Sequence, residues 1–181
     1  MEQHHLRSAA GPGTALEVTP ASAGWTSLHF SVLALDAQAH VFQTGDQEVA
    51  IVPLEGVIAA SVEGEDHVLR RTSVFAEMAH VLYVPPGRSV RLEAQGPAEV
   101  AVGGAPAEGR YPVRLITPDE MRSEVRGGGA ATRQVNHILA HPLPAARLIL
   151  YEVYVPRGGW SGWPPHCHDG YECSPYLEET Y

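Results

Sequence analysis

The chain has 181 residues, a formal net charge of −9 and a hydrophobic content of 44%. No apolar run approaches the ~18 residues of a membrane-spanning helix, and the N-terminus lacks the basic and apolar regions of a secretory signal. All 12 basic residues are arginines. They form no basic stripe, which disfavours nucleic acid as a partner. We therefore expect a cytoplasmic protein that binds a small molecule or a cation, with no nucleic-acid or membrane partner.

The first part of the chain contains eight short runs of alternating or β-branched residues, separated by turns rich in glycine and proline. These predicted strands cover residues 28–35, 40–44, 48–54, 56–62, 67–71, 81–84, 89–94 and 99–102. Eight such strands favour a small antiparallel barrel or jelly roll over an open sheet, because closure protects the strand edges. The predicted fold class is all-β.

The residues that follow predict a boundary between two domains. Thr117-Pro118-Asp119-Glu120 has the pattern of a capping box with proline at the first helical position, and predicts a short helical turn. The glycine-rich stretch 126–130 is typical of a linker. We expect an N-terminal barrel over residues 1–125 and the start of a second domain over residues 126–181, with strands at 132–139 and 146–155. The last run, 176–181, resembles the first part of a further strand, so we expect this second domain to be incomplete.

The candidate functional residues lie near the C-terminal end. His166 and His168 are separated by one residue, so in a strand both imidazoles point to the same face. With a carboxylate from a neighbouring strand, they predict a divalent metal site of the kind that binds Zn, Mn or Fe. Of the two nearby glutamates we choose Glu179, because alternation places it on the face of Leu177 and Tyr181, which we expect inside a barrel. Glu178 is then expected to face solvent or a neighbouring subunit.

Two other interpretations of this segment are considered. An isolated pair of histidines is frequent by chance, although the preceding Trp-Pro-Pro favours a shaped pocket. Cys167 and Cys173 could also form a closed zinc site with the histidines. We disfavour that site, because Cys167 lies between the histidines and projects to the opposite face of a strand. Cys167 is better interpreted as a buried filler or a free thiol.

The whole chain resembles the 5-deoxyglucuronate isomerases of myo-inositol catabolism, relatives of 5-keto-4-deoxyuronate isomerase that consist of two cupin barrels. The resemblance follows a series of short motifs in this order: Leu16-Glu17-Val18-Thr19-Pro20, Thr44-Gly45-Asp46-Gln47-Glu48-Val49, Tyr83-Val84-Pro85-Pro86-Gly87, Leu115-Ile116-Thr117-Pro118, Trp163-Pro164-Pro165-His166-Cys167-His168-Asp169 and Tyr176-Leu177-Glu178-Glu179-Thr180-Tyr181.

The resemblance implies a bicupin whose second barrel, truncated here, holds a divalent metal through His166, His168, Glu179 and a histidine from a later strand. The first barrel lacks such a histidine pair and is expected to be metal-free. The implied activity is the aldose–ketose isomerisation of 5-deoxy-D-glucuronate to 5-dehydro-2-deoxy-D-gluconate. Glu178 is a candidate catalytic base, and Arg157 a candidate for binding the carboxylate of this small anionic sugar.

Two further functions are kept as alternatives. The truncated chain could be an inert cupin that serves as a scaffold or binds a sugar, because loss of one metal ligand weakens metal binding. It could also be another metal-dependent cupin enzyme, such as an oxygenase. Oxygen uptake would distinguish the oxygenase, and absence of metal would indicate the scaffold. We expect a homo-oligomer, because pairing of subunits would cover strand edges.

Overall fold

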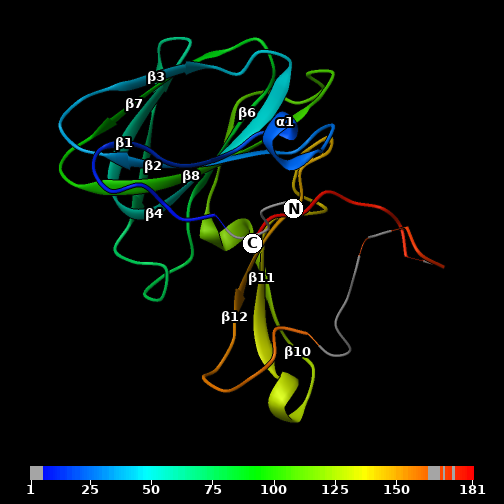
Figure 1. Cartoon of the computed structure of the whole chain (residues 1–181). Coiled ribbons are helices and arrows are strands. Elements are labelled where there is room, and N and C mark those ends of the chain that lie inside the picture. The colour runs from blue at the N-terminus through cyan, green and yellow to red at the C-terminus, as the bar shows by residue number, and fades with distance from the viewer. Residues whose placement is uncertain (1–5, 163–167, 169, 173) are drawn as a thin grey trace.

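Nine strands build a barrel at the N-terminal end of the chain (Figure 1). The structure is a computed structural model and describes residues 6–162, 168, 170–172 and 174–181. The strands of the barrel are β1 (Gly13–Val18), β2 (His29–Leu35), β3 (His40–Gln43), β4 (Gln47–Val62), β5 (Glu65–Arg71), β6 (Val81–Val84), β7 (Ser89–Ala94), β8 (Ala98–Pro106) and β9 (Arg114–Ile116). The all-β prediction is confirmed.

Strand β4 belongs to both walls of the barrel. Its first half pairs with β8 and β6, and its second half pairs with β5 and β7. The register with β8 shifts between Pro53 and Glu55, where proline lacks the N–H needed for regular pairing. Gly56 follows with a φ of 99°, which favours glycine. The sequence predicts two strands here, over 48–54 and 56–62, but the chain bends at this point without ending the strand.

Short elements near the barrel edges are not predicted by the sequence patterns. Strands β1 and β9 pair with the outer edges of β2 and β6. Helix α1 (Pro20–Ala23) begins with a capping box in which Ser22 takes the position usually held by glutamate or glutamine. The capping box at Thr117 is confirmed and opens a 3-10 turn, Pro118–Glu120.

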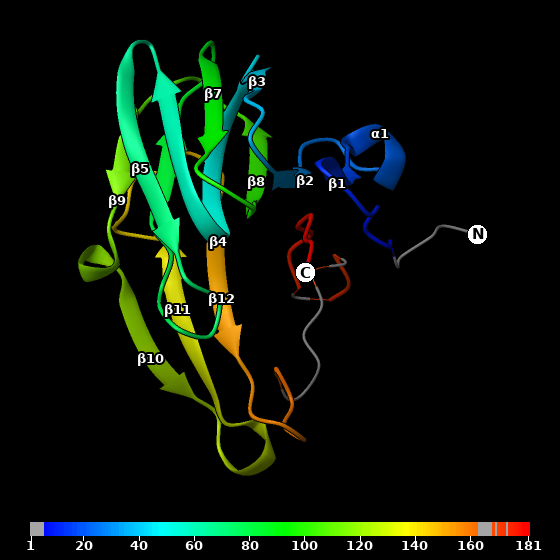
Figure 2. The ribbon, with the colours of Figure 1, turned by 90° about the vertical axis from the view of Figure 1, so that its left-hand side faces the viewer.

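A second, three-stranded sheet extends from one end of the barrel (Figure 2). It consists of β10 (Arg122–Arg126), β11 (Arg133–Leu139) and β12 (Leu150–Tyr154), all antiparallel. The glycine-rich stretch 127–129 and the 3-10 turn Gly129–Ala131 connect β10 to β11 inside this sheet. The domain boundary at 125/126 stays a prediction, and the three-stranded sheet begins at Arg122.

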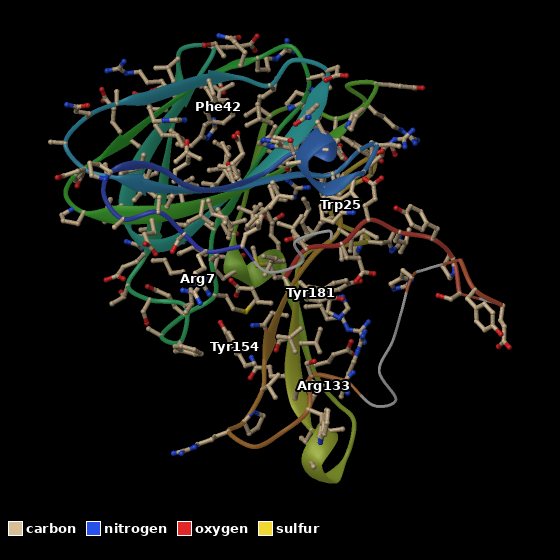
Figure 3. The ribbon with its side chains drawn as sticks, viewed as in Figure 1. Arg7, Trp25, Phe42, Arg133, Tyr154 and Tyr181 are labelled. Atoms are coloured by element: carbon tan, nitrogen blue, oxygen red, sulfur yellow. The ribbon has the colours of Figure 1, made fainter. Side chains whose placement is uncertain are left out.

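Two apolar clusters form the core. The first fills the barrel, where Phe42 packs against the buried side chains of both walls (Figure 3). The second lies on the other face of β4 and β6 and contains Tyr83 together with Ile138 and Leu139 of β11. Both faces of the first half of β4 are therefore buried. The barrel and the three-stranded sheet share this second cluster, so apolar packing holds them together.

The C-terminal segment differs from its prediction. Residues 174–181 form no strand, and the side chains of Leu177 and Tyr181 are exposed, at 50% and 97%. Alternation along a strand therefore does not describe this segment, and the prediction that it lines a barrel is wrong. Within the described ranges, no helix has the length and apolar character needed to cross a membrane.

Candidate metal site at the C-terminal segment

The carboxylate of Glu178 binds the loop between α1 and β2. It accepts hydrogen bonds from the backbone N–H groups of Thr26, Ser27 and Leu28, at 2.6, 2.8 and 2.7 Å. The hydroxyl of Thr26 donates a fourth hydrogen bond at 2.9 Å. The side chain that we expected to face solvent or a neighbouring subunit thus faces the barrel. Figure 2 shows the C-terminal segment, in red, on the side of the barrel that carries β1 and α1.

These hydrogen bonds stabilise the charged form of Glu178. Partial burial opposes ionisation, but the N–H groups of Thr26, Leu28 and Ser27 outweigh it and lower the pKa of Glu178 below its ordinary value. The carboxylate is therefore held as an anion among fixed donors. The sequence contains no signal for this contact, because the donors are backbone groups about 150 residues away along the chain.

The structure brings His168 and Glu179 together, two of the three metal ligands that the sequence predicts. His168 Nε2 lies 3.0 Å from Glu179 Oε1, and their side chains are 28% and 29% exposed. The backbone N–H of Leu177 donates to the carbonyl oxygen of His168 at 3.0 Å, which brings the two stretches of chain side by side. The second carboxylate oxygen of Glu179 accepts a hydrogen bond from the hydroxyl of Tyr181.

The chemistry and spacing of this pair fit a divalent cation. Imidazole nitrogen and carboxylate oxygen are ordinary ligands of Zn, Mn and Fe. Two ligands about 2.1 Å from one ion are separated by about 3.0 Å at the right angle of octahedral coordination and by about 3.4 Å at the tetrahedral angle of zinc. His168 Nε2 and Glu179 Oε1 are 3.0 Å apart, which fits an octahedral ion such as Mn²⁺ better. Without an ion, the same separation is that of a hydrogen bond.

The other predicted ligand, His166, lies outside the described residues, as do Cys167 and Cys173. Within the described part of the chain, no group of three or more histidine, cysteine, aspartate or glutamate residues could hold a metal ion. The described donor set consists of His168 and Glu179. The closed zinc site with cysteines likewise falls on residues that are not described.

Arg157, the predicted carboxylate-binding residue, lies on the turn after β12. The turn is closed by a hydrogen bond from the N–H of Gly159 to the carbonyl of Pro156 at 2.9 Å, and Arg157 is exposed to solvent. A guanidinium in this position is accessible to an anion.

A second carboxylate, this one buried, also joins distant parts of the chain. Glu48, fully buried in β4, accepts hydrogen bonds from the backbone N–H groups of Ala146, Arg147 and Leu148, at 2.8, 2.5 and 2.8 Å. The hydroxyl of Tyr83 donates to the same carboxylate at 2.8 Å, and burial raises the pKa of this tyrosine. Glu48 therefore fixes the loop that leads into β12.

A buried ion pair is the third contact, after those of Glu178 and Glu48, that joins distant parts of the chain. The guanidinium of Arg71 contacts both carboxylate oxygens of Glu152, at 2.5 and 2.8 Å, and the hydroxyl of Tyr154 at 3.2 Å. Burial opposes the charge of Arg71, but the hydrogen bond and the charge interaction with Glu152, together with the contact with Tyr154, outweigh it and raise the pKa of the arginine. Figure 3 labels Tyr154 at the junction between the barrel and the small sheet.

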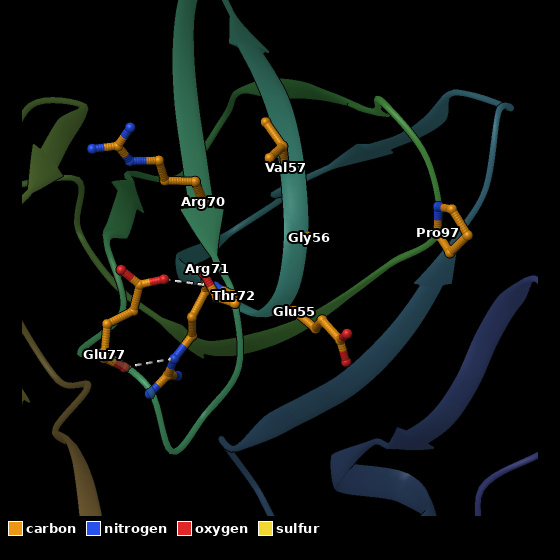
Figure 4. Close-up of a pocket in the computed structure, with 8 residues that line it drawn as sticks. All are labelled: Glu55, Gly56, Val57, Arg70, Arg71, Thr72, Glu77 and Pro97. Atoms are coloured by element: carbon orange, nitrogen blue, oxygen red, sulfur yellow. Dashed lines mark hydrogen bonds between the residues drawn. The ribbon is translucent and has the colours of Figure 1, made fainter.

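Arg71 also lines a cavity of about 460 Å³ at the end of β5 (Figure 4). Its Nε donates to the carbonyl oxygen of Glu77 at 3.0 Å, and the N–H of Thr72 donates to the carboxylate of Glu77 at 2.6 Å. The guanidinium is thus engaged on several sides by protein oxygens. We assign the guanidinium of Arg71 a structural role at the junction of the two sheets.

The chain is similar to several known proteins. The chain is 40% identical over 175 residues to a 5-deoxy-glucuronate isomerase of Geobacillus kaustophilus, covering 93% of this chain and 63% of the relative. It is 32% identical over 172 residues to the 5-deoxy-glucuronate isomerase of Bacillus subtilis strain 168, with 91% and 64% covered. The chain thus spans less than two thirds of the length of these relatives.

A solved structure gives the same relationship in three dimensions. The crystal structure of an IolB-like protein from Salmonella typhimurium LT2 superposes with a TM-score of 0.87 at 30% sequence identity, covering 94% of this chain and 66% of that one. Residues 2–181 match the sequence model of the KduI/IolB family. The chain described here belongs to the KduI/IolB family.

Proposed function

We propose that this chain contributes the metal-binding segment of an aldose–ketose isomerase that converts 5-deoxy-D-glucuronate to 5-dehydro-2-deoxy-D-gluconate in myo-inositol catabolism. The observation that carries the proposal is the 3.0 Å contact between His168 Nε2 and Glu179 Oε1. The 5-deoxy-glucuronate isomerase of Geobacillus kaustophilus, 40% identical to this chain, supports the choice of substrate.

In the proposed site His168 and Glu179 hold the cation, together with His166. A divalent cation supplies Lewis acidity, which polarises a carbonyl group and acidifies the neighbouring C–H bond. The side chains of His168 and Glu179 are 28% and 29% exposed, so both keep surface that an ion can reach. The reaction moves hydrogen within one molecule: an aldehyde becomes an alcohol while the adjacent alcohol becomes a ketone.

We propose that Arg157 binds the substrate carboxylate. Its exposed guanidinium presents several N–H donors, which match a carboxylate in a bidentate arrangement. Replacing it should therefore raise the Michaelis constant, by about tenfold for loss of one charge-assisted contact. A homo-oligomer and a cytoplasmic location stay predictions.

The proposal is tested by supplying 5-deoxy-D-glucuronate to the protein loaded with Mn²⁺, Zn²⁺ or Fe²⁺ and following the sugar by NMR. We expect formation of the ketose without oxygen uptake, loss of turnover in His168→Ala and Glu179→Ala, and a raised Michaelis constant in Arg157→Ala. Arg147→Ala provides a control arginine. Metal uptake without conversion would contradict isomerase activity of this chain by itself and favour the cupin that serves as a scaffold or binds a sugar. Oxygen consumption during turnover would indicate an oxygenase instead.

A further inference from the structure

We propose that Glu178 is a positioning residue, whose carboxylate fixes the C-terminal segment to the Thr26–Leu28 loop and thereby holds Glu179 against His168. The inference rests on the proposed function in taking His168 and Glu179 as metal ligands. It assigns to Glu178 a role that differs from that of a catalytic base, because in this role its side chain contacts the protein and not the sugar.

The receiving loop is preorganised to bind a carboxylate. Three successive backbone N–H groups and one hydroxyl converge on the two oxygens of Glu178. The loop is fixed on one side by α1, where Gly24 closes the helix with a φ of 70° and the N–H of Trp25 donates to Pro20 O at 2.8 Å. On the other side β2 begins at His29. The barrel therefore presents these donors from a fixed frame.

The two neighbouring glutamates contact different partners. Glu178 binds the barrel loop, while Glu179 contacts His168. Because they are consecutive, fixing the side chain of Glu178 restricts the position of the backbone that carries Glu179. Leu177, the residue before this pair, is bound through its N–H to the carbonyl of His168. The barrel contact, the backbone contact and the ligand contact thus occur within three consecutive residues.

A carboxylate suits this position better than its amide. Glutamine would replace one acceptor oxygen with an NH₂ donor directed at N–H groups that also need acceptors. Aspartate keeps the charge but is shorter by one methylene, so it cannot reach the same donors without movement of the backbone. We therefore expect the contact with the loop to be strongest in the wild type, weaker in Glu178→Asp, and weakest in Glu178→Gln and Glu178→Ala.

Hydrogen exchange of the full chain tests the anchor without metal or substrate. In Glu178→Ala and Glu178→Gln we expect exchange at the N–H groups of Thr26, Ser27, Leu28 and Leu177 to rise about tenfold or more. Amides in the centre of β8 should be unchanged, which shows that the barrel remains folded. Glu65→Gln, at an exposed position of β5, is the matched control for the loss of charge.

Titration with Mn²⁺ alone then tests the link to the site. We expect Mn²⁺ affinity to fall on the order of 10- to 100-fold in Glu178→Ala and Glu178→Gln, to fall less in Glu178→Asp, and to be unchanged in Glu65→Gln. The inference would be overturned if, in the Glu178 variants, the Leu177 amide stays protected while the loop amides exchange freely. It would also be overturned if the wild type binds Mn²⁺ and the Glu178 variants bind it with the same affinity. If the wild type takes up no Mn²⁺, the proposed function fails, and the Leu177 amide still decides whether Glu178 positions the segment.

Discussion

Arg71, at the end of β5, and Glu152, in β12, form a bidentate ion pair across the junction between the barrel and the three-stranded sheet. The side chain of Arg71 is fully buried and that of Glu152 is 15% exposed. Removing the carboxylate leaves a buried guanidinium without its counter-charge. We expect Glu152→Gln to lower the free energy of unfolding by about 3–5 kcal/mol, as measured by urea denaturation.

The exposed pair between Arg91 and Glu93 provides the control for this prediction. Both side chains are about half exposed, at 51% and 52%, so water screens the interaction. Glu93→Gln should change the free energy of unfolding by less than about 1 kcal/mol. Equal effects of the two substitutions would show that the ion pair at the junction contributes no more than a surface contact.

Glu48 is predicted to fix the loop before β12. Glu48→Gln places an amide donor against three backbone N–H groups and the Tyr83 hydroxyl, and we expect it to cost about 2–4 kcal/mol of stability. Tyr83→Phe removes a single donor and should cost about 1 kcal/mol. Thermal or urea unfolding measures both variants. A Glu48→Gln protein as stable as the wild type would refute this role.

The pairing of β10 with β11 should weaken in acid. Glu124 accepts a hydrogen bond from His137 at 2.8 Å, and this bond, with nearby arginines, lowers the pKa of Glu124 from its ordinary value of 4.5. The pKa of Glu124 is lower in the folded protein than in the unfolded chain. The stabilisation is therefore fully present above the unfolded pKa and is lost as the pH falls through the folded pKa.

Hydrogen exchange at the amides of β10 and β11, measured between neutral pH and the acid range below 4.5, tests this expectation once intrinsic exchange rates are corrected. Protection should decline in the wild type and vary less with pH in Glu124→Gln. Glu93→Gln, on β7, leaves this sheet intact and serves as the control. The same pH profile in wild type and Glu124→Gln would assign the acid sensitivity to another group.

Gly56 allows the bend of β4. A Cβ atom at this position would lie 2.5 Å from Ala98 Cβ, and φ is already 99°. Gly64 has a φ of 87° with nothing within 4 Å, so Gly64→Ala measures the backbone strain alone. We expect Gly64→Ala to cost about 1–2 kcal/mol and Gly56→Ala about 3 kcal/mol or more. Equal losses of stability in the two variants would show that the chain around Gly56 and Ala98 moves enough to relieve the contact.

The sequence predicts much of the barrel because the signals for its strands are local. Strands β6 and β7 match their predicted ranges of 81–84 and 89–94, since alternation and turn residues act over a few positions. The predicted strand 146–155 is observed only over Leu150–Tyr154. Its first residues are instead held by Glu48 through backbone N–H groups, which side-chain periodicity does not reveal.

The candidate site shows the same division. The proximity of His168 and Glu179 follows from residue type and from the resemblance to the family, although the reason given for choosing Glu179, a strand with its inner face in a barrel, is wrong. The contact between Glu178 and the Thr26–Leu28 loop depends on backbone donors that any residue supplies. No pattern of side chains can therefore predict it.

The central claim is that His168 and Glu179 share one cation. It is tested most directly by binding Mn²⁺ to the protein and recording nitrogen couplings to the metal by pulsed electron paramagnetic resonance. We expect one bound Mn²⁺ with imidazole coupling, a reduced coupling in His168→Ala, and weakened binding in both His168→Ala and Glu179→Ala. Bound Mn²⁺ with the same coupling and the same affinity in both variants would contradict it.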